Sequence, residues 1–177
     1  MRFSQTEIAG LVVVELEPFL DERGSFARIW SSEELANQGL TATLAQCSIS
    51  RNVRAGTLRG LHFQEAPHEE AKLVRCIRGA MFDVAVDLRA GSPTRGQWFG
   101  VELSAENGRA LYVPEGCAHG FQTLADDTEV LYLISTPYVP AASAGVRWDD
   151  PALGIAWPDA PTRTISERDA AWPLLTG

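Results

Sequence analysis

The sequence predicts an all-β fold, a sandwich or a barrel, with a few short helices at its periphery. Short runs of apolar and β-branched residues recur along most of the chain, and turn signals built from Gly, Asn and Asp separate them. Capping signals of helices mark only two brief stretches. Many short strands at this spacing are typical of β-sandwiches and β-barrels.

The first predicted strand opens the chain with LVVVELEPF, residues 11–19. Residues 72–89, KLVRCIRGAMFDVAVDLR, are predicted to form two strands that are broken by a turn at Arg78-Gly79. In the second of these strands an apolar row that includes Val84 and Val86 alternates with Asp83, Ala85 and Asp87. Asp83 therefore points either to solvent or into a polar cavity.

Four more strands are predicted, in two pairs: QWFGVELS with RALYVP, and GFQTL with EVLYLIS. The first pair flanks Asn107-Gly108, which is a strong signal for a hairpin. The second pair flanks another turn at Asp126-Asp127.

The two helical stretches are short. SSEELANQG offers Ser31 as an N-cap, Glu34 three residues later and a glycine as a stop. SERDAAW offers a second capping pattern in Ser166 and Asp169. The tail from about Thr136 is rich in Pro, Ala and Trp, and it is predicted to form loops wrapped on the sheet.

The length of 177 residues favours one domain that spans residues 1–177, with room for a sizeable core. Hydrophobic residues make up 45% of the chain and charged residues 21%, as in an ordinary soluble globular protein. The net charge of −8 argues against nucleic-acid binding, which needs a basic surface to displace counterions. It leaves open an anionic small molecule, because a few arginines in a cleft can bind a diphosphate.

The three cysteines, Cys47, Cys76 and Cys117, are odd in number and lack CxxC spacing, so neither a disulfide framework nor a zinc cluster is indicated. We expect free, buried thiols in a reducing cytosol. The N-terminal MRFSQTEIAG lacks the apolar region of a signal peptide. The longest apolar runs, such as VLYLI, are far shorter than the ~20 residues of a membrane span. These features predict a cytoplasmic protein without a membrane segment.

The chain has three histidines, of which two lie in apolar, strand-like contexts: His62 in RGLHFQ and His119 in CAHGFQ. His68 lies in a polar loop and is expected to be solvated. One such strand histidine is more often a hydrogen-bonded core residue, but two on separate strands of a barrel favour a shared cavity. Metal-binding barrels of this kind usually place two histidines one residue apart, whereas His62 is followed by Phe63 and Gln64, so a metal site is disfavoured.

Four other polar residues have an ordinary structural explanation when each is taken alone. Lys72 could protect the edge of a sheet, and Tyr132 could be a core tyrosine with its hydroxyl at the rim. Asp169 could belong to a helix capping box. Arg23, in DERGSF, could be a turn arginine.

Eight stretches change this balance because they occur together and in order: DERGSFAR, GTLRGLHFQ, EAKLVRCIRGAMFDVAVDLR, SPTRGQWFGVELSAEN, ALYVPEGCAHGFQTL, VLYLISTPY, WDDPALGIAWP and ISERDA. Over nearly the whole chain this succession resembles the dTDP-4-dehydrorhamnose 3,5-epimerase family, and VPEGCAHGF and LRGLHFQ are its most specific motifs. The resemblance implies a double-stranded β-helix jelly roll, a cupin-like barrel, that forms a homodimer and uses no metal or other cofactor.

The resemblance also implies a reaction. The protons on C3 and C5 of dTDP-4-dehydro-6-deoxyglucose are removed and returned through an enolate, which gives dTDP-4-dehydrorhamnose. His62 would be the general base, with Asp169 orienting its imidazole and balancing its charge. Lys72 would stabilise the enolate oxygen, and Tyr132 would be the acid on the opposite face of the sugar ring.

Eight further residues would bind the nucleoside-diphosphate sugar by the same resemblance: Arg23, Phe26, Gln46, Ser48, Arg59, Asp83, His119 and Tyr138. Arg59 would bind the diphosphate or the sugar, and Arg23 would reach the nucleotide in the partner subunit's site. Arg59 and His62 are three residues apart, so an ideal strand would turn them to opposite faces. A twist or bulge near Gly60 is therefore needed if both are to serve one cavity.

The chain departs from the family pattern in two places. Ser48 stands in QCSIS where the family usually has Asn, and the LIST that follows Tyr132 is more apolar than in many members. The acid–base set is intact. Two alternatives remain open: a mono-epimerase acting at only C3 or C5 of a related sugar nucleotide, and a sugar-nucleotide-binding cupin without turnover. A metal-dependent cupin oxygenase or isomerase is disfavoured by the missing second histidine.

Overall fold

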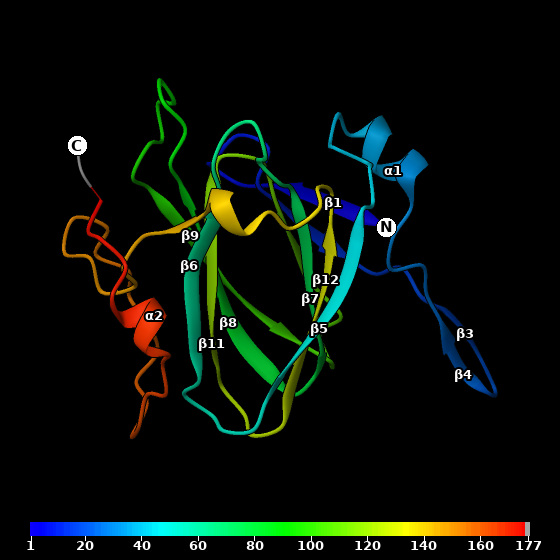
Figure 1. Cartoon of the computed structure of the whole chain (residues 1–177). Coiled ribbons are helices and arrows are strands. Elements are labelled where there is room, and N and C mark those ends of the chain that lie inside the picture. Colours follow the sequence, from blue (N-terminus) through cyan, green and yellow to red (C-terminus); the bar gives the residue numbers. More distant parts are fainter. Residues whose placement is uncertain (176–177) are drawn as a thin grey trace.

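The computed structural model describes residues 1–175, and two antiparallel sheets make up most of it (Figure 1). The larger sheet has six strands in the order β1 (Arg2–Gln5), β2 (Val12–Glu15), β10 (Ala110–Val113), β7 (Lys72–Arg78), β12 (Thr128–Ile134) and β5 (Gln46–Asn52). The smaller has five in the order β13 (Ser143–Gly145), β6 (Leu58–Gln64), β11 (Cys117–Thr123), β8 (Ala80–Asp87) and β9 (Trp98–Ser104). A separate pair, β3 (Phe19–Asp21) and β4 (Gly24–Phe26), projects away from both sheets.

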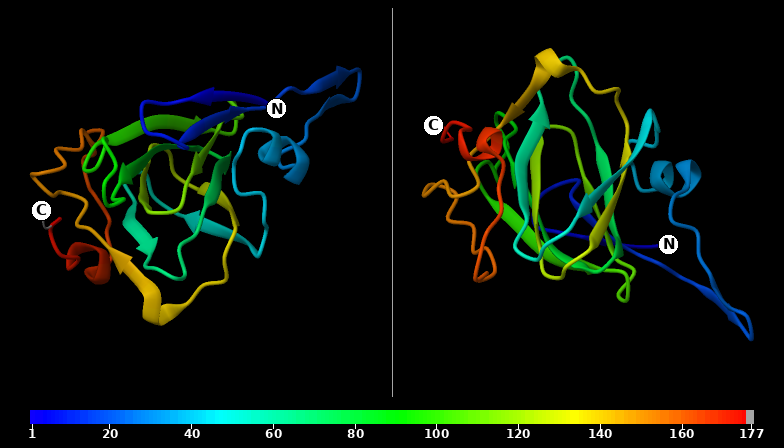
Figure 2. Two further views of the ribbon diagram at one scale, coloured as in Figure 1. Left: turned by 90° about the horizontal axis from the view of Figure 1, so that it is seen from above. Right: turned by 60° about the horizontal axis from the view of Figure 1, so that its bottom comes forward.

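The chain passes back and forth between the two large sheets. From β5 to β13 each strand lies in the sheet opposite to the preceding one, except that β8 and β9 pair with each other. Figure 2 shows the two sheets curving around a common interior. This winding is that of a double-stranded β-helix, and the predicted jelly-roll fold is confirmed.

The hairpin predicted at Asn107-Gly108 is wrong, because β9 and β10 lie in different sheets. A turn does form there: the side chain of Asn107 accepts hydrogen bonds from two main-chain N–H groups, and Gly108 has a φ of +60°. Leu103 of β9 and Leu111 of β10 pack into the same core from opposite sides. The dipeptide therefore determines the turn, and burial of these side chains determines which strands pair.

The other predicted elements correspond closely to the structure. The turn at Arg78-Gly79 separates β7 from β8, and each helix begins at its predicted cap: α1 (Ser32–Asn37) follows Ser31, and α2 (Glu167–Ala170) follows Ser166. The predicted loop tail also contains a 3₁₀ turn (Pro140–Ala142) and β13. Five strands went unpredicted: β1, β3, β4, β5 and β13. All but β5 have only three or four residues, which is too short for a pattern to be recognised.

The main core lies between the two large sheets. It contains apolar side chains from both of them, including Val74, Met81, Ala85, Leu111 and Phe121. The outer face of the six-stranded sheet is partly covered by residues from the N-terminal region, and the outer face of the five-stranded sheet by the C-terminal segment. A central strand such as β8 is therefore buried or half-buried at every residue, including Asp83 and Asp87.

The free cysteines differ in burial. Cys76 and Cys117 are buried in the core as predicted, and burial raises the pKa of their thiols to about 11 and about 12. Cys47 is exposed on β5, so the prediction of a buried thiol is wrong at that position. None of the helices within residues 1–175 is long and apolar enough to cross a membrane.

Candidate active site

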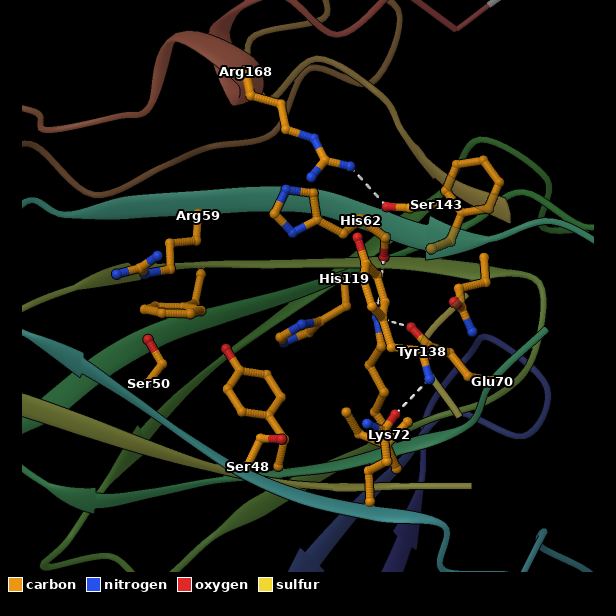
Figure 3. Close-up of a pocket in the computed structure, with 16 residues that line it drawn as sticks. Ser48, Ser50, Arg59, His62, Glu70, Lys72, His119, Tyr138, Ser143 and Arg168 are labelled. Carbon is orange, nitrogen blue, oxygen red and sulfur yellow. Dashed lines mark hydrogen bonds and ion pairs between the residues drawn. The ribbon is translucent and has the colours of Figure 1, made fainter. Parts of the chain in front are cut away.

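A cavity of about 330 Å³ opens between the two large sheets (Figure 3). Side chains from both sheets and from the C-terminal segment line it: Gln46, Ser48, Ser50, Arg59, His62, Phe63, Gln64, Glu70, Lys72, His119, Phe121, Tyr132, Ile134, Tyr138, Ser143 and Arg168. Eight of the twelve residues predicted for the site belong to this lining. Asp169 and Asp83 lie directly behind two of these residues, and Arg23 and Phe26 lie elsewhere.

His62, on β6, forms a pair with Asp169 of α2. Nε2 of the imidazole lies 2.7 Å from Oδ1 of Asp169, and the main-chain N–H of Gly60 donates to Oδ2 at 3.2 Å. The helix cap places the carboxylate, since the N–H of Asp169 donates to the hydroxyl of Ser166. Burial raises the pKa of Asp169, but the hydrogen bond and the charge of His62 outweigh it, and the pKa is lowered overall. The carboxylate is therefore ionised near neutral pH, and it holds a proton on Nε2.

Arg59 and His62 both line the cavity although they are three residues apart on β6. The pairing of β6 with β11 shifts register between His119 and Phe121, opposite the segment that joins Arg59 to His62. This irregularity lies near Gly60, where the sequence analysis predicted a twist or bulge that would let both side chains face one cavity. The guanidinium of Arg59 is anchored at one end, where Nε donates to Asn52 at 2.8 Å.

His119 and Asp83 form a second pair, deeper in the barrel. Nε2 of His119 lies 2.7 Å from Oδ1 of Asp83, and Asp83 has no exposed surface. The other carboxylate oxygen, Oδ2, has no hydrogen-bond partner among the described residues. Burial raises the pKa of Asp83, and the nearby charges of His119 and Lys72 only partly offset this. Asp83 therefore points to the interior and not to solvent, but it lies behind His119 and does not itself line the cavity.

Tyr132, on β12, faces His62 from the opposite sheet. Its ring meets the imidazole of His119 edge-on, with 6.0 Å between ring centroids. Desolvation and the charge of Asp83 raise the pKa of the phenol, and the charge of Arg59 opposes them to a lesser extent. The phenol therefore keeps its proton throughout the neutral pH range.

Lys72 is nearly buried at the start of β7, and two groups contact its ammonium. Nζ lies 2.8 Å from Oε1 of Glu70, and it donates to the main-chain carbonyl of His62 at 3.3 Å. Lys72 is thus an inward-facing cation of the cavity and not a solvated lysine at a sheet edge.

The mouth of the cavity is polar. The side chain of Gln46 accepts a hydrogen bond from the main-chain N–H of Tyr138, and Arg168 donates to the hydroxyl of Ser143 at 2.8 Å. Hydrogen bonds to Ser143 and Arg168 lower the pKa of Tyr138. Ser48 lies beside Tyr132, because the two are register partners on β5 and β12.

Arg23 and Phe26 do not reach this cavity. Both belong to the β3–β4 hairpin, which projects from the barrel (Figure 1). There Arg23 pairs with Asp21, and Phe26 is largely exposed. Within one chain, therefore, these two residues lie apart from the other predicted site residues. Their predicted contact with a partner subunit's site concerns an assembly of two chains and stays a prediction.

Several lining residues were missed from the sequence, among them Ser50, Gln64, Glu70, Ser143 and Arg168. Alternation offered a signal for three of them: Ser50 lies two residues after Ser48, Gln64 two residues after His62, and Glu70 two residues before Lys72. Ser143 and Arg168 belong to β13 and α2, whose positions depend on tertiary packing. His68 is half-buried and lies outside the cavity lining. Within residues 1–175 no three His, Cys, Asp or Glu side chains are grouped so that they could hold a metal ion.

Comparison with known proteins assigns the family. Residues 5–177 match the family model described as dTDP-4-dehydrorhamnose 3,5-epimerase. The enzyme of that name from Sinorhizobium fredii is 45% identical over 175 residues, which cover 99% of this chain and 90% of the relative.

Solved structures agree with this assignment. A dTDP-4-dehydrorhamnose 3,5-epimerase from Bacillus anthracis, with TDP and PPi bound, superimposes with a TM-score of 0.94 at 40% identity and covers 98% of this chain and 99% of its own. A dTDP-6-deoxy-D-glucose-3,5-epimerase from Legionella pneumophila, in complex with dTDP-4-keto-L-rhamnose, superimposes with a TM-score of 0.92 at 38% identity. The superposition covers 98% of this chain and 92% of the Legionella chain. The chain belongs to the dTDP-4-dehydrorhamnose 3,5-epimerase family and is a sugar-nucleotide epimerase.

Proposed function

We propose that this epimerase inverts C3 and C5 of dTDP-4-dehydro-6-deoxyglucose through an enolate, with His62 as base and Tyr132 as acid. One observation carries the assignment of roles: His62 and Tyr132 line the same cavity from opposite sheets. Inversion needs a base on one face of the sugar ring and an acid on the other, because a single group that returned its own proton would regenerate the starting sugar. Two facing sheets supply the two sides.

His62 is suited to remove the proton next to the ketone. Because Nε2 holds its proton against Asp169, Nδ1 is the nitrogen that can accept one. The imidazolium formed after proton transfer stays paired with the ionised carboxylate, which lowers the free energy of that state. The side chain is 40% exposed, so a substrate in the cavity can contact it.

Tyr132 completes the inversion. Its raised pKa keeps the phenol protonated until a strongly basic enolate carbon lies beside it. Lys72 stabilises the charge that develops on the ketone oxygen between these two groups. A cation near that oxygen stabilises the enolate more than the ketone, and therefore lowers the barrier to proton removal.

The diphosphate group, which is the anionic part of the substrate, binds at Arg59. Anchored through Nε to Asn52, this arginine keeps its terminal N–H groups for phosphate oxygens. Gln46, Ser48 and Tyr138 surround the remaining space and hydrogen-bond the sugar and nucleotide. The pair of His119 and Asp83 forms the polar floor beneath the sugar.

The active assembly is a homodimer, and the β3–β4 hairpin supports this part of the proposal. Phe19, Leu20 and Phe26 are 78%, 76% and 74% exposed on a two-stranded element that has few contacts with its own barrel. Such an apolar arm is stabilised when a second chain covers it. In that arrangement Arg23 of one subunit reaches the nucleotide in the cavity of the other.

Solvent exchange tests the reaction. The protein is incubated with dTDP-4-dehydro-6-deoxyglucose in D₂O, and deuterium is counted by NMR at each carbon of the sugar. Inversion at both carbons predicts label at C3 and at C5. Label at one carbon alone would identify a mono-epimerase, and absence of label would identify a protein that binds the sugar without turnover.

A further inference from the structure

Glu70 is a cavity-lining carboxylate to which the mechanism above gives no role. It lies two residues before Lys72, and Ala71 between them packs into the apolar cluster on the outer face of the six-stranded sheet. Side chains of extended backbone alternate between faces, so Glu70 and Lys72 both point inward. Each side chain is 9% exposed, and Oε1 of Glu70 lies 2.8 Å from Nζ of Lys72.

The contacts of the Lys72 ammonium define its position. On one side it pairs with Glu70, and on the other it donates to the carbonyl of His62, as the dashed lines in Figure 3 indicate. An ammonium carries three N–H donors, so these two contacts leave a donor for a substrate oxygen. The second contact also ties the cation to the main chain of the residue that acts as base.

A lysine side chain has four rotatable bonds, and another carboxylate attracts it here. The charge of Lys72 acts on Asp83, whose Oδ2 has no hydrogen-bond partner among the described residues. Without Glu70, the ammonium would be free to move toward Asp83, deeper in the barrel. In that position the cation would no longer be held beside the ketone oxygen.

We propose that Glu70 is a positioning residue that holds the ammonium of Lys72 beside the ketone oxygen of the substrate. This inference rests on the proposed function, because it assigns Glu70 a role only through Lys72. It predicts an effect on the chemical step and little effect on binding, since Glu70 contacts the cation and not the diphosphate group bound by Arg59.

Glu70→Ala and Glu70→Gln separate this role from simple packing. Glu70→Ala removes the contact, and we expect kcat to fall at least tenfold while KM stays within about twofold. Glu70→Gln keeps the shape and an oxygen that can accept from the ammonium, so kcat should stay within about threefold of wild type. Glu69→Ala serves as the matched control, because it removes the neighbouring, exposed carboxylate of the same segment and should leave both constants unchanged.

A double-mutant cycle with Lys72→Met tests whether Glu70 affects kcat through Lys72. If Glu70 acts through Lys72, adding Glu70→Ala to Lys72→Met should change kcat less than twofold. An unchanged kcat in Glu70→Ala, or a full tenfold loss added on top of Lys72→Met, would overturn the inference. An unchanged kcat in Lys72→Met itself would instead refute the role proposed for Lys72, so the two failures are distinguishable. Thermal unfolding of each variant checks that the barrel is intact.

Discussion

His62 and His119 each lie 2.7 Å from a carboxylate through Nε2, yet the two pairs differ in their surroundings. The side chain of His62 is 40% exposed and that of His119 only 5%. The pKa of Asp169 is lowered, whereas burial raises that of Asp83. The pair at the cavity surface therefore combines a firmly ionised carboxylate with an accessible imidazole, and this favours His62 as the base.

Replacement of that base should abolish turnover without loss of the substrate site. For His62→Ala we expect kcat to fall by about 10²–10⁴, the usual contribution of a general base. Affinity for dTDP, measured by isothermal titration calorimetry, should stay within about threefold, because Arg59 is untouched. His68→Ala is the control, since His68 lies outside the cavity lining. Near-normal turnover in His62→Ala would show that another group is the base.

Tyr132→Phe should separate proton removal from inversion. Without the phenol, the enolate still forms and His62 returns deuterium from D₂O to the original face. Labelled starting sugar is therefore expected to accumulate while inverted product falls at least tenfold, as followed by NMR. Tyr112→Phe, on the outer face of the six-stranded sheet, should behave like wild type. Equal losses of exchange and product in Tyr132→Phe would count against its role as acid.

Among the elements of the fold, β6 and β11 determine how the site is assembled. Gly60 and Gly120 face each other across these strands, and a Cβ on Gly60 would lie 2.5 Å from Cα of Gly120. Gly60 also has a φ of +135°, a backbone conformation that residues with a side chain rarely adopt. Because its N–H donates to Asp169, the same residue fixes the irregular strand and the carboxylate behind His62.

Gly60→Ala tests this element. The added methyl group must displace backbone, so we expect a loss of about 2 kcal/mol or more in the free energy of unfolding and a fall of at least tenfold in kcat. Gly91→Ala is a matched control with positive φ and open space around its Cβ, and it should cost only about 1 kcal/mol with normal turnover. Wild-type stability and rate in Gly60→Ala would mean that the close approach of the two strands is not required.

On the scale of the whole molecule, the jelly roll places the proposed base and the proposed acid on two walls of one cavity. The β3–β4 hairpin extends away from the barrel (Figure 2). An element with three apolar side chains more than 70% exposed adds little to the stability of its own barrel. Contact with a second chain, as in the proposed homodimer, would bury these side chains and stabilise the hairpin.

Light scattering after size-exclusion chromatography tests this assembly. Wild type should elute with the mass of two chains at micromolar concentration, and Phe19→Ser combined with Leu20→Ser should shift the protein toward one chain, because the apolar arm then gains less from burial. Leu174→Ser, in the C-terminal segment, removes an exposed leucine elsewhere and should leave the mass unchanged. A monomeric wild type would refute the homodimer.

Local signals predicted much of the fold. Alternation identified β7 and β8, and capping residues identified both helices, because these features depend on neighbours within a few residues. Strand pairing was less accessible: the hairpin signal at Asn107-Gly108 determined the turn but not its partners. The short strands β1 and β13 depend on the sheets they join, so their own residues did not reveal them.

The sequence by itself determined the all-β class, the family motifs and eight of the sixteen residues that line the cavity. Only the tertiary structure decided that Arg59 and His62 share one cavity, that Glu70 pairs with Lys72, and that Arg23 and Phe26 lie on a projecting hairpin. The physical reason is the separation in sequence over which each interaction acts. Backbone propensity and side-chain alternation act between near neighbours in sequence, whereas the ion pairs and the register shift depend on how distant strands pack around a common core.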